Sequence, residues 1–488
     1  MMLFMGIDVG SSGCKVSVVD ETGILKCSSH QPYSFSYNGD FSEIDPNIVF
    51  NAVLDSIRDI TSRYDLSELA TLSVTSFGEM FVLVDENRNV LCNSISYSDP
   101  RGTEQIEEMM SINDKVYSIT GTTVNPMYSL PKLLWIKENN PAIYKKAYKM
   151  CMFADFILVK LGADFHIDYS LAARTLMFDI KKRCWSIKIL NYSKIDKALL
   201  PPLVPSGEVV GEIDTRISEL TGLPKSVKLL AGGHDQSCAA LGAGIIRDGI
   251  ALDGMGSNEC IVPCFDRPML NDTMKISNLA CIPYMLPDKY VTYAFNKTAG
   301  TVFDWYKKII GADSYNSMLQ QMSDKPTGMF FMPHFAGAAT PYMDDNSTGA
   351  IVGLNLTTSR GDLTKSIIEG LNYEIKVNLK CLEKAGFTLN EMYVAGGMSN
   401  SDEILKIKAD ILGMPIKRLE ISQTGTLAMA IFGSVAMGIY EDIPTAVKNL
   451  VRSGSVFIPN ENNHNAYCEL FDKYEKMYNA VKTIYGRK

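Results

Sequence analysis

The chain contains one short structural plan twice, once at its start and once just past its midpoint. The first copy reads GIDVGSSGCK and includes Asp8, and the second reads DGMGSNECIV and begins at Asp253. Each copy is predicted to be a strand, a loop of glycine and serine, and a second strand. Duplicated domains that face each other across a cleft would bring both loops to one ligand. The repeat therefore predicts two related α/β halves around a shared site.

The first loop has features that suit phosphate binding. Gly10 lets the turn expose backbone N–H groups, and Ser11 and Ser12 add hydroxyl donors. Lys15 adds a positive charge nearby. Asp8 points from the first strand towards the same place, and Mg²⁺ prefers oxygen ligands of this kind. The loop lacks the GxxxxGK[ST] pattern and leads into a strand, so a plain hairpin turn is the alternative interpretation.

A polar cluster stands between a strand and a helix at the middle of the chain. The stretch GGHDQSCAALGAG follows an apolar strand at 227–231, and its paired glycines let the backbone bend sharply into a helix of small residues. His234, Asp235 and Gln236 lie at this bend. We interpret Asp235 as a catalytic base that is ionised at neutral pH without a large pKa shift. A polar turn without chemistry is the alternative.

Two other turns carry side chains suited to a hydroxylated ligand. Gly78, Glu79 and Met80 lie between two predicted strands and could present a carboxylate. Tyr97 and Asp99 lie in a second turn, where a carboxylate can bond sugar hydroxyls while a ring covers a C–H face. Glutamate at the end of a strand is also common on plain surfaces.

Paired glycines recur near the C-terminal end. Gly396 and Gly397 follow an apolar strand at 393–395 and precede a predicted helix. Paired glycines let a flat ring such as adenine approach the backbone closely. A simple turn from strand to helix is the alternative.

The remaining pattern is interpreted as scaffold. We expect residues 103–200 to be mainly helical framework, including the segments 168–170 and 173–175. Apolar spacing and capping residues predict further helices at 46–60, 362–385, 404–411, 425–438 and, as one amphipathic helix, 464–488.

Composition narrows the class of protein. At 488 residues the chain is too long for one hydrophobic core, and its net charge of -8 without a basic stripe argues against a nucleic-acid partner. No secretory signal and no apolar run of about 18 residues is found, which argues against a membrane protein. The eleven cysteines are scattered and lack CxxC pairs, as is typical of reduced cytoplasmic thiols. We expect a cytoplasmic protein, and the sequence leaves a homodimer open.

In their order along the chain, these motifs resemble those of the FGGY carbohydrate kinases, within the sugar kinase, heat-shock and actin superfamily. The resemblance covers nearly the whole length and is carried by GIDVGSSGCK, EIDP, YSDPR, SLPKLLW, DYSLAARTLMFD, GGHDQ, DGMGSNE, the loop 337–353, AGGMSNSDEILKIKADILG and the helix from Gly425. It implies an α/β fold of two ribonuclease-H-like domains of the actin and hexokinase type, 1–245 and 246–488, with an active-site cleft between them. It also implies ATP and Mg²⁺ as cofactors and a small sugar or polyol as substrate.

The resemblance implies roles for individual residues. Asp235 matches the base that takes a proton from the sugar hydroxyl, and Asp8 and Asp235 match Mg²⁺ positions. Phosphate and nucleotide contacts are implied for Gly10, Ser11, Ser12, Lys15, Gly256, Ser257, Gly300, Gly396, Gly397, Asn400 and Ser401. Sugar contacts are implied for Gly78, Glu79, Met80, Tyr97, Asp99, His234 and Gln236.

Departures from the family pattern leave the substrate open. Where xylulose kinases tend to read Gln-Met-His-Gly and glycerol kinases read Arg-Glu-Thr, this chain has Phe77-Gly78-Glu79-Met80. We expect phosphorylation of a hydroxyl of a small ketose or polyol, with a ketopentose such as xylulose as the first choice. A catalytically silent sugar or nucleotide sensor and an ATPase that uses water are the alternatives. The presence of Asp8, Lys15 and Asp235 favours the kinase, because a sensor does not need a base.

Overall fold

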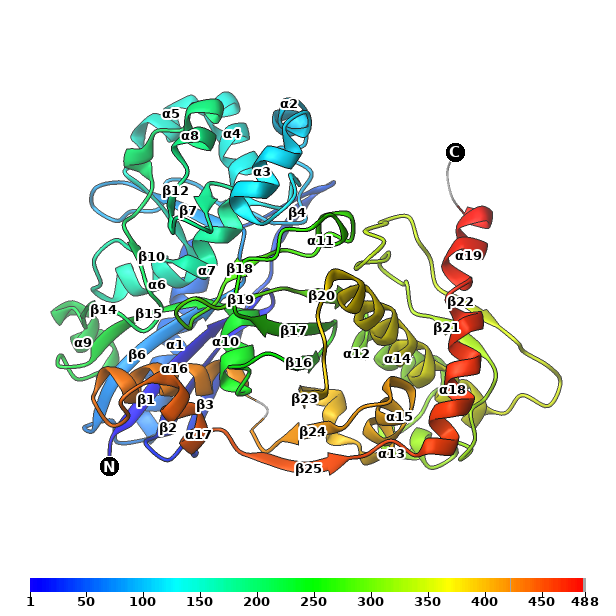
Figure 1. Cartoon of the computed structure of the whole chain (residues 1–488). Helices are drawn as coiled ribbons and strands as arrows, with labels where there is room; N and C mark the ends of the chain where they lie inside the picture. The colour runs from blue at the N-terminus through cyan, green and yellow to red at the C-terminus, as the bar shows by residue number, and fades with distance from the viewer. Residues whose placement is uncertain (422, 486–488) are drawn as a thin grey trace.

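Two mixed β-sheets, one from each half of the chain, form the centre of the molecule (Figure 1). The computed structural model describes residues 1–421 and 423–485. The first sheet has six strands in the order β14 (Val209–Glu212), β15 (Lys228–His234), β6 (Leu69–Ser76), β1 (Leu3–Val9), β2 (Gly13–Asp20) and β3 (Leu25–Pro32). The second sheet has eight strands in the order β18 (Ile282–Pro283), β19 (Tyr290–Val291), β17 (Glu259–Phe265), β16 (Ile250–Met255), β23 (Glu391–Ala395), β24 (Ile416–Leu419) and β25 (Ser453–Phe457), with β20 (Ala294–Asn296) also paired to β17.

The two strand–loop–strand hairpins have matching places in these sheets. β1 pairs with β2 in antiparallel orientation and with β6 in parallel orientation. β16 pairs in the same way with β17 and β23. The duplication predicted from the sequence is thus present in the topology of both sheets, and the α/β fold class is confirmed.

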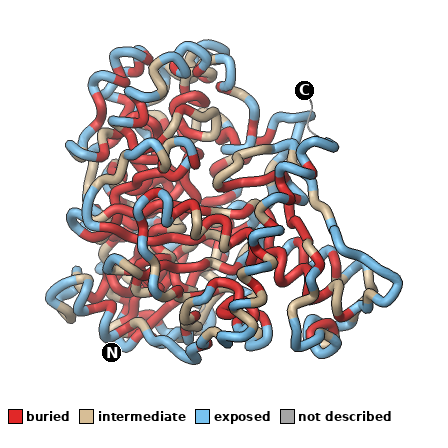
Figure 2. Tube along the Cα trace, turned by 45° about the vertical axis from the view of Figure 1, so that its right-hand side comes forward, coloured by how far each residue is buried: buried red, intermediate tan, exposed pale blue. Residues whose placement is uncertain are grey.

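Helices cover the first sheet. α1 (Pro46–Arg63) packs on β2 and β3, and α6 (Phe153–Leu161) packs on β6 and β15. α16 (Thr424–Ala436) packs on β1 and β6, where a Cβ on Gly6 would lie only 2.9 Å from the Thr426 side chain. Side chains alternate along a strand, so Asp8 lies on the same face of β1 as Gly6. Buried residues are concentrated in and between these layers (Figure 2).

The junction between the halves is a tight packing of two helices. α10 (Asp235–Gly242) lies against α16, and a Cβ on Gly242 would lie 1.8 Å from the Thr424 carbonyl oxygen. Glycine is therefore required for this approach. α16 comes from the second half of the sequence but packs on the first sheet. A division near residue 245 therefore separates the two sheets but places this helix in the other half from the sheet that it covers.

The predicted helical framework is present in the part of the sequence between β6 and β14. Residues 103–200 contain α2 (Glu107–Met110), α3 (Asn113–Thr120), α4 (Ser129–Asn139), α5 (Pro141–Lys146), α6, α7 (Tyr169–Ala172) and α8 (Ile187–Ser193). In the second half, α14 (Arg360–Ala385) begins with a capping box of Ser359 and Asp362, and α15 (Asp402–Leu412) ends at Gly413.

The prediction of one helix over 464–488 was wrong. The structure has α18 (Glu461–Tyr474) and α19 (Met477–Tyr485), and residues 486–488 lie outside the described part. The hydroxyls at the break contact different elements: Tyr474 donates to Glu374 at 2.7 Å and Tyr478 donates to Asp344 at 2.8 Å. Tertiary contacts thus divide a continuous amphipathic pattern.

Within residues 1–421 and 423–485, no helix combines the length and the apolar character that crossing a membrane requires.

Candidate active site

Asp235 is the first residue of α10 and follows the buried strand β15 directly. Its Oδ1 accepts a hydrogen bond from the backbone N–H of Gln236 at 2.6 Å and lies 3.5 Å from Nε2 of His234. The Asp235 side chain is 30% exposed, whereas His234 is buried. The strand-to-helix bend therefore presents one accessible carboxylate above a buried imidazole.

The pKa of Asp235 is raised to about 7, chiefly by burial and then by the negative charge of Asp8. Glu79 raises it further, and the positive charge of Arg174 lowers it in part. The expectation of an ordinary pKa was therefore wrong, because local sequence does not show that another carboxylate lies beside this one. A base with a pKa near neutrality is well matched to proton transfer at physiological pH.

Asp8 and Lys15 face each other across the first hairpin as register partners of β1 and β2. Burial raises the pKa of Asp8 to about 6, and Lys15 opposes that rise. Asp8 and Asp235 are thus two desolvated carboxylates that repel each other, and Lys15 opposes the effect on Asp8 while Arg174 opposes it on Asp235. Mg²⁺ is commonly held by one or two carboxylates together with water and phosphate oxygens. The donor set of Asp8 and Asp235 fits such an ion.

The first loop leaves its hydroxyls accessible. The backbone N–H of Gly10 donates to the Gly13 carbonyl at 3.0 Å, and the Tyr33 hydroxyl donates to the Gly10 carbonyl at 2.6 Å. Ser11 and Ser12 are exposed at the tip. The turn is thus fixed from behind while its serine side chains face solvent.

Glu79 lies in a strained turn between β6 and β7 (Phe81–Val84). Its φ is +65°, in the left-handed region that glutamate rarely adopts. Its Oε1 accepts a hydrogen bond from Nε of Arg174 at 2.5 Å. A Cβ on Gly78 would lie 2.8 Å from the His234 ring and 2.9 Å from the Arg174 side chain, so glycine permits this close packing. The predicted glycine-glutamate turn therefore lies directly beside the histidine that precedes Asp235.

Arg174 and Tyr293 belong to the same group, and neither was predicted from the sequence as a site residue. The Arg174 guanidinium carbon lies 5.1 Å from the Tyr128 ring centre and 5.6 Å from that of Tyr293. The Tyr293 hydroxyl lies 2.7 Å from Oγ of Ser237 on α10. The segment of Arg174 was predicted to be framework, and no local motif marks Tyr293. Because Tyr293 comes from the second half of the chain, both halves build the site.

His234 is held in its neutral form. Burial, together with the positive charge of Arg174, moves its pKa well below the usual value. Its ring lies 5.2 Å from that of Tyr293, centre to centre, and its Nδ1 has no hydrogen-bond partner within the described residues. Its backbone N–H donates to Oγ of Ser170 at 2.9 Å. The imidazole can therefore donate or accept one hydrogen bond without bringing a charge.

The other predicted sugar contacts divide into two kinds. The whole Tyr97 residue is 38% exposed. The pKa of its hydroxyl is raised first by desolvation of that group and then by the charges of Glu79 and Asp235, so Tyr97 lies near both carboxylates. Asp99 is buried, and its carboxylate accepts hydrogen bonds from Arg101 and from the backbone N–H of Ser42 at 2.7 Å. Asp99 thus holds its own turn together, and its role as a sugar contact stays a prediction.

Two more of these predicted residues flank the group. Met80 is only 1% exposed and packs as a core residue. Gln236 follows Asp235 on α10 and is half-buried.

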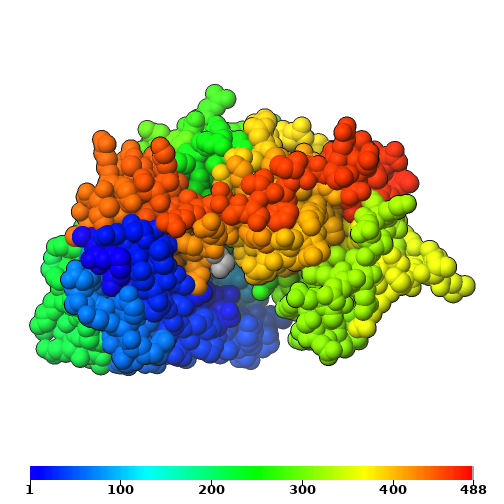
Figure 3. All heavy atoms as spheres, turned by 90° about the horizontal axis from the view of Figure 1, so that it is seen from below, coloured from blue at the N-terminus to red at the C-terminus, as the bar shows by residue number. Residues whose placement is uncertain are grey.

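A cavity of about 970 Å³ brings the predicted nucleotide residues of the second half together. It lies between the second hairpin loop, α12 (Gly300–Ile310), α13 (Tyr315–Leu319) and the start of α15. Six of the predicted residues line it: Gly256, Ser257, Gly300, Gly397, Asn400 and Ser401. The residues that line this cavity all come from the second half of the chain. In the space-filling view from below, the surface is also hollowed between the N-terminal residues in blue and the yellow-green part of the second half (Figure 3).

Two glycines hold the second hairpin loop from opposite sides. The backbone N–H of Gly300 donates to the Gly256 carbonyl at 3.1 Å, and a Cβ on Gly300 would lie 2.8 Å from that oxygen. Gly396 has a φ of +110°, and a Cβ there would lie 2.5 Å from the Met255 carbonyl oxygen. Gly396 therefore packs against the loop, whereas its neighbour Gly397 lines the cavity.

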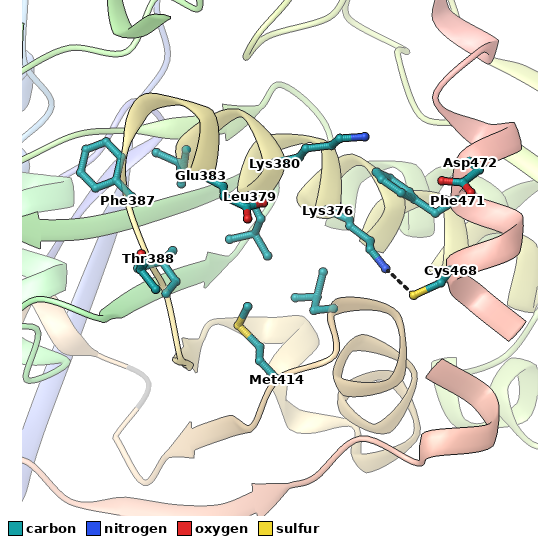
Figure 4. Close-up of a pocket in the computed structure, with 13 residues that line it drawn as sticks. Lys376, Leu379, Lys380, Glu383, Phe387, Thr388, Met414, Cys468, Phe471 and Asp472 are labelled. Atoms are coloured by element: carbon teal, nitrogen blue, oxygen red, sulfur yellow. Dashed lines mark hydrogen bonds between the residues drawn. The ribbon is translucent and has the colours of Figure 1, made fainter. Parts of the chain in front are cut away.

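A second hollow, of about 430 Å³, lies between α14 and α18 (Figure 4). There Nζ of Lys376 donates to the Ile411 carbonyl at 2.7 Å and lies 3.6 Å from Sγ of Cys468. None of the described residues that line it was predicted as a site residue.

Comparisons with known proteins agree with this geometry. The N-terminal domain of the "FGGY family of carbohydrate kinases" matches residues 3–242, and the C-terminal domain of the same family matches residues 266–437. The xylulose kinase of Staphylococcus epidermidis is 28% identical over 98% of this chain and 97% of its own length.

Solved structures show the same fold. A ligand-bound xylulose kinase and a gluconate kinase, both from Lactobacillus acidophilus, each superpose with a TM-score of 0.91 at 24% identity. The first covers 100% of this chain and 99% of its own, and the second covers 99% of each. With both family domains matched along the sequence, the chain belongs to the FGGY family of carbohydrate kinases and is a phosphotransferase.

Proposed function

We propose that this protein transfers the γ-phosphoryl group of ATP to a hydroxyl of a small ketose or polyol, with Asp235 as the general base. The observation that supports this most directly is the group formed by Asp235, Asp8 and Lys15. An accessible carboxylate with a pKa near 7 is close enough to a second carboxylate for their charges to interact, and that second carboxylate faces a lysine across the hairpin. Phosphoryl transfer needs chiefly positioning and charge compensation, and this group offers both.

In this proposal each side chain has a limited task. Asp235 accepts the proton of the attacking hydroxyl, and Glu79, held by Arg174, orients the hydroxylated substrate. Lys15, Ser11 and the N–H groups of the loop face the phosphate side. Closure of the two halves would exclude water, which otherwise competes as the acceptor.

Asp8 and Asp235 are the residues that would hold Mg²⁺, and the ion would neutralise phosphate charge. The second hairpin loop and the start of α15 would bind the nucleotide, because the predicted nucleotide residues line one cavity there. The division between 1–245 and 246–488 is proposed on the same basis, since each half supplies one loop.

A ketopentose such as xylulose is the first substrate that we propose. Relatives that are 28% and 27% identical over nearly the whole chain are named xylulose kinase. A relative named gluconokinase also matches, at 24% identity over 99% of this chain. The turn at Gly78-Glu79-Met80, rather than the overall fold, should therefore decide the substrate.

The test is ADP release by the purified protein with Mg-ATP against ketopentoses, ketohexoses, deoxy sugars, aldonates and polyols, with a sugar-free sample as the blank. We expect release that depends on one ketose or polyol. Equal release in the blank would indicate an ATPase and contradict the proposal. If no compound of the panel caused ADP release while ATP binding was intact, the result would contradict the proposal and favour a sensor.

A further inference from the structure

Three charged side chains are completely buried behind the second hairpin loop. Nζ of Lys408 lies 2.5 Å from Oδ2 of Asp253 and 2.8 Å from Oε1 of Glu259. The exposed fractions of the side chains are 0% for Lys408, 0% for Asp253 and 3% for Glu259. Lys408 is on α15, whereas the two carboxylates lie on β16 and β17, on either side of the loop 256–258.

The register of the hairpin explains why one lysine reaches both carboxylates. Met255 is the register partner of Glu259, and Asp253 lies two residues before Met255 on the same strand. Side chains alternate along a strand, so Asp253 and Glu259 share one face of the hairpin. Helix α15 presents Lys408 to that face.

The environment of Glu259 favours its neutral form. Burial raises the pKa of Glu259, the charge of Asp253 raises it further and Lys408 opposes the rise. A neutral Glu259 can donate its proton to Oδ1 of Asp253, a buried atom without a hydrogen-bond partner in the described residues. Lys408 and Asp253 then form the ion pair of the trio.

Such a trio is not needed for stability alone. Well-packed apolar side chains of similar volume are often as stabilising as a buried ion pair, because desolvation of the charges is costly. The trio instead fixes the orientation of α15 relative to the hairpin, since each of its hydrogen bonds restricts an angle as well as a distance. The two parts that it joins, the loop and α15, are two of the four parts that line the 970 Å³ cavity.

We propose that Lys408 is a positioning residue for phosphoryl transfer, which locks the loop 256–258 against α15 in the arrangement that binds the nucleotide. The contact runs through Asp253 and Glu259, since Lys408 itself is not among the residues that line the cavity. The inference rests on the proposed function, because it takes this cavity to be the nucleotide site.

The test uses the double variant Lys408→Met/Asp253→Asn, which removes the cation and the anion together and leaves no unpaired buried charge. Binding of Mg-ATP is measured by calorimetric titration, the KM values for ATP and for the sugar by ADP release, and folding by thermal unfolding. Lys376→Met, at the second hollow, is the control for loss of a lysine elsewhere in the second half of the chain.

We expect the double variant to unfold near the wild-type temperature and to bind ATP at least about tenfold more weakly, since small misplacements of binding groups are costly. The sugar KM should stay within about twofold of wild type, and Lys376→Met should leave both affinities unchanged. Wild-type ATP affinity in the folded double variant would overturn the inference, as would parallel losses of ATP and sugar affinity.

Glu259→Gln provides a milder second variant if the double variant fails to fold, because Lys408 and Asp253 keep their ion pair. It should weaken ATP binding about threefold, and unchanged binding would again overturn the inference. Failure of the wild-type protein to bind Mg-ATP would instead overturn the proposed function itself.

Discussion

The two hairpins share one topology and differ in how their charges are compensated. In the first, Asp8 faces Lys15 across the strands, both are partly accessible, and the pKa of Asp8 is raised to about 6. In the second, Asp253 and Glu259 bond to Lys408 inside the protein. The first hairpin keeps a carboxylate whose charge a ligand or metal can compensate, and the second compensates its charges internally.

Aspartates at similar places in a duplicated fold can thus have different surroundings, since Asp8 is the register partner of Lys15 and Asp253 that of Ile261. Asp8 is followed two residues later by Gly10, and Asp253 three residues later by Gly256, so sequence spacing suggests related roles. Their environments support different proposed roles, for Asp8 in the chemistry and for Asp253 in the support of a binding loop.

The sharpest test of this contrast is removal of the lysine from each hairpin. Lys408→Met should lower the free energy of unfolding by about 3–5 kcal/mol, because it leaves Asp253 buried without a cation. Lys15→Met should lower it by less than about 1 kcal/mol, since Lys15 is partly solvated. Urea unfolding measures both values, and equal losses would remove the distinction.

The aspartates provide the complementary test. Asp8→Asn should lower kcat by about 10²-fold while the fold is kept, because it removes charge from the reacting region. Asp253→Asn should act mainly on the KM for ATP. Steady-state kinetics with varied ATP separates the two effects, and a large loss of kcat in Asp253→Asn with unchanged KM would reverse the assignment.

The raised pKa of Asp235 predicts that ionisation of this carboxyl group lowers the free energy of unfolding. Its pKa of about 7 in the folded protein lies above the usual value near 3.8, so the unfolded chain loses this proton first as pH rises. Between about pH 4 and pH 7 the contribution of Asp235 to the free energy of unfolding therefore falls as the pH rises. At pH 8, Asp235→Asn should be more stable than wild type by about 1–3 kcal/mol, allowing for partial exposure, and at pH 4 about equal. A less stable variant at pH 8 would contradict the burial of this charge.

The smallest effects concern the glycines around the second loop. Gly396→Ala should cost about 1–3 kcal/mol, since its φ of +110° and the Met255 carbonyl oxygen both exclude a Cβ. Gly397→Ala should cost less than about 1 kcal/mol, because a Cβ at that position would have no neighbouring atom within 4 Å. Thermal unfolding compares the stabilities of the two variants. Equal destabilisation would show that Gly396 is not packed tightly against the loop.

Local sequence predicted much of the scaffold and the positions of several site residues. Asp235 at a strand-to-helix bend, the hairpin from Asp8 to Lys15, and the capped helix from Arg360 follow from patterns a few residues long. The six cavity residues of the second half were also predicted.

Contacts between distant residues explain what was missed. Arg174 meets Glu79 across 95 positions of sequence, and Lys408 meets Asp253 across 155. The hydrogen bond from Ser42 to the Asp99 carboxylate joins residues 57 positions apart, and no local pattern shows it. The pKa of Asp235 depends on Asp8, which only the assembled sheet brings near.

The most direct test of the account is turnover by Asp235→Asn with the sugar that the panel identifies, beside Asp288→Asn, whose carboxylate is 96% exposed. Asp235→Asn should keep the wild-type fold and lose at least about 10²-fold in kcat, the scale expected for loss of a general base. Asp288→Asn should keep full activity. Turnover by Asp235→Asn within about threefold of wild type would contradict the assignment of Asp235 as the base.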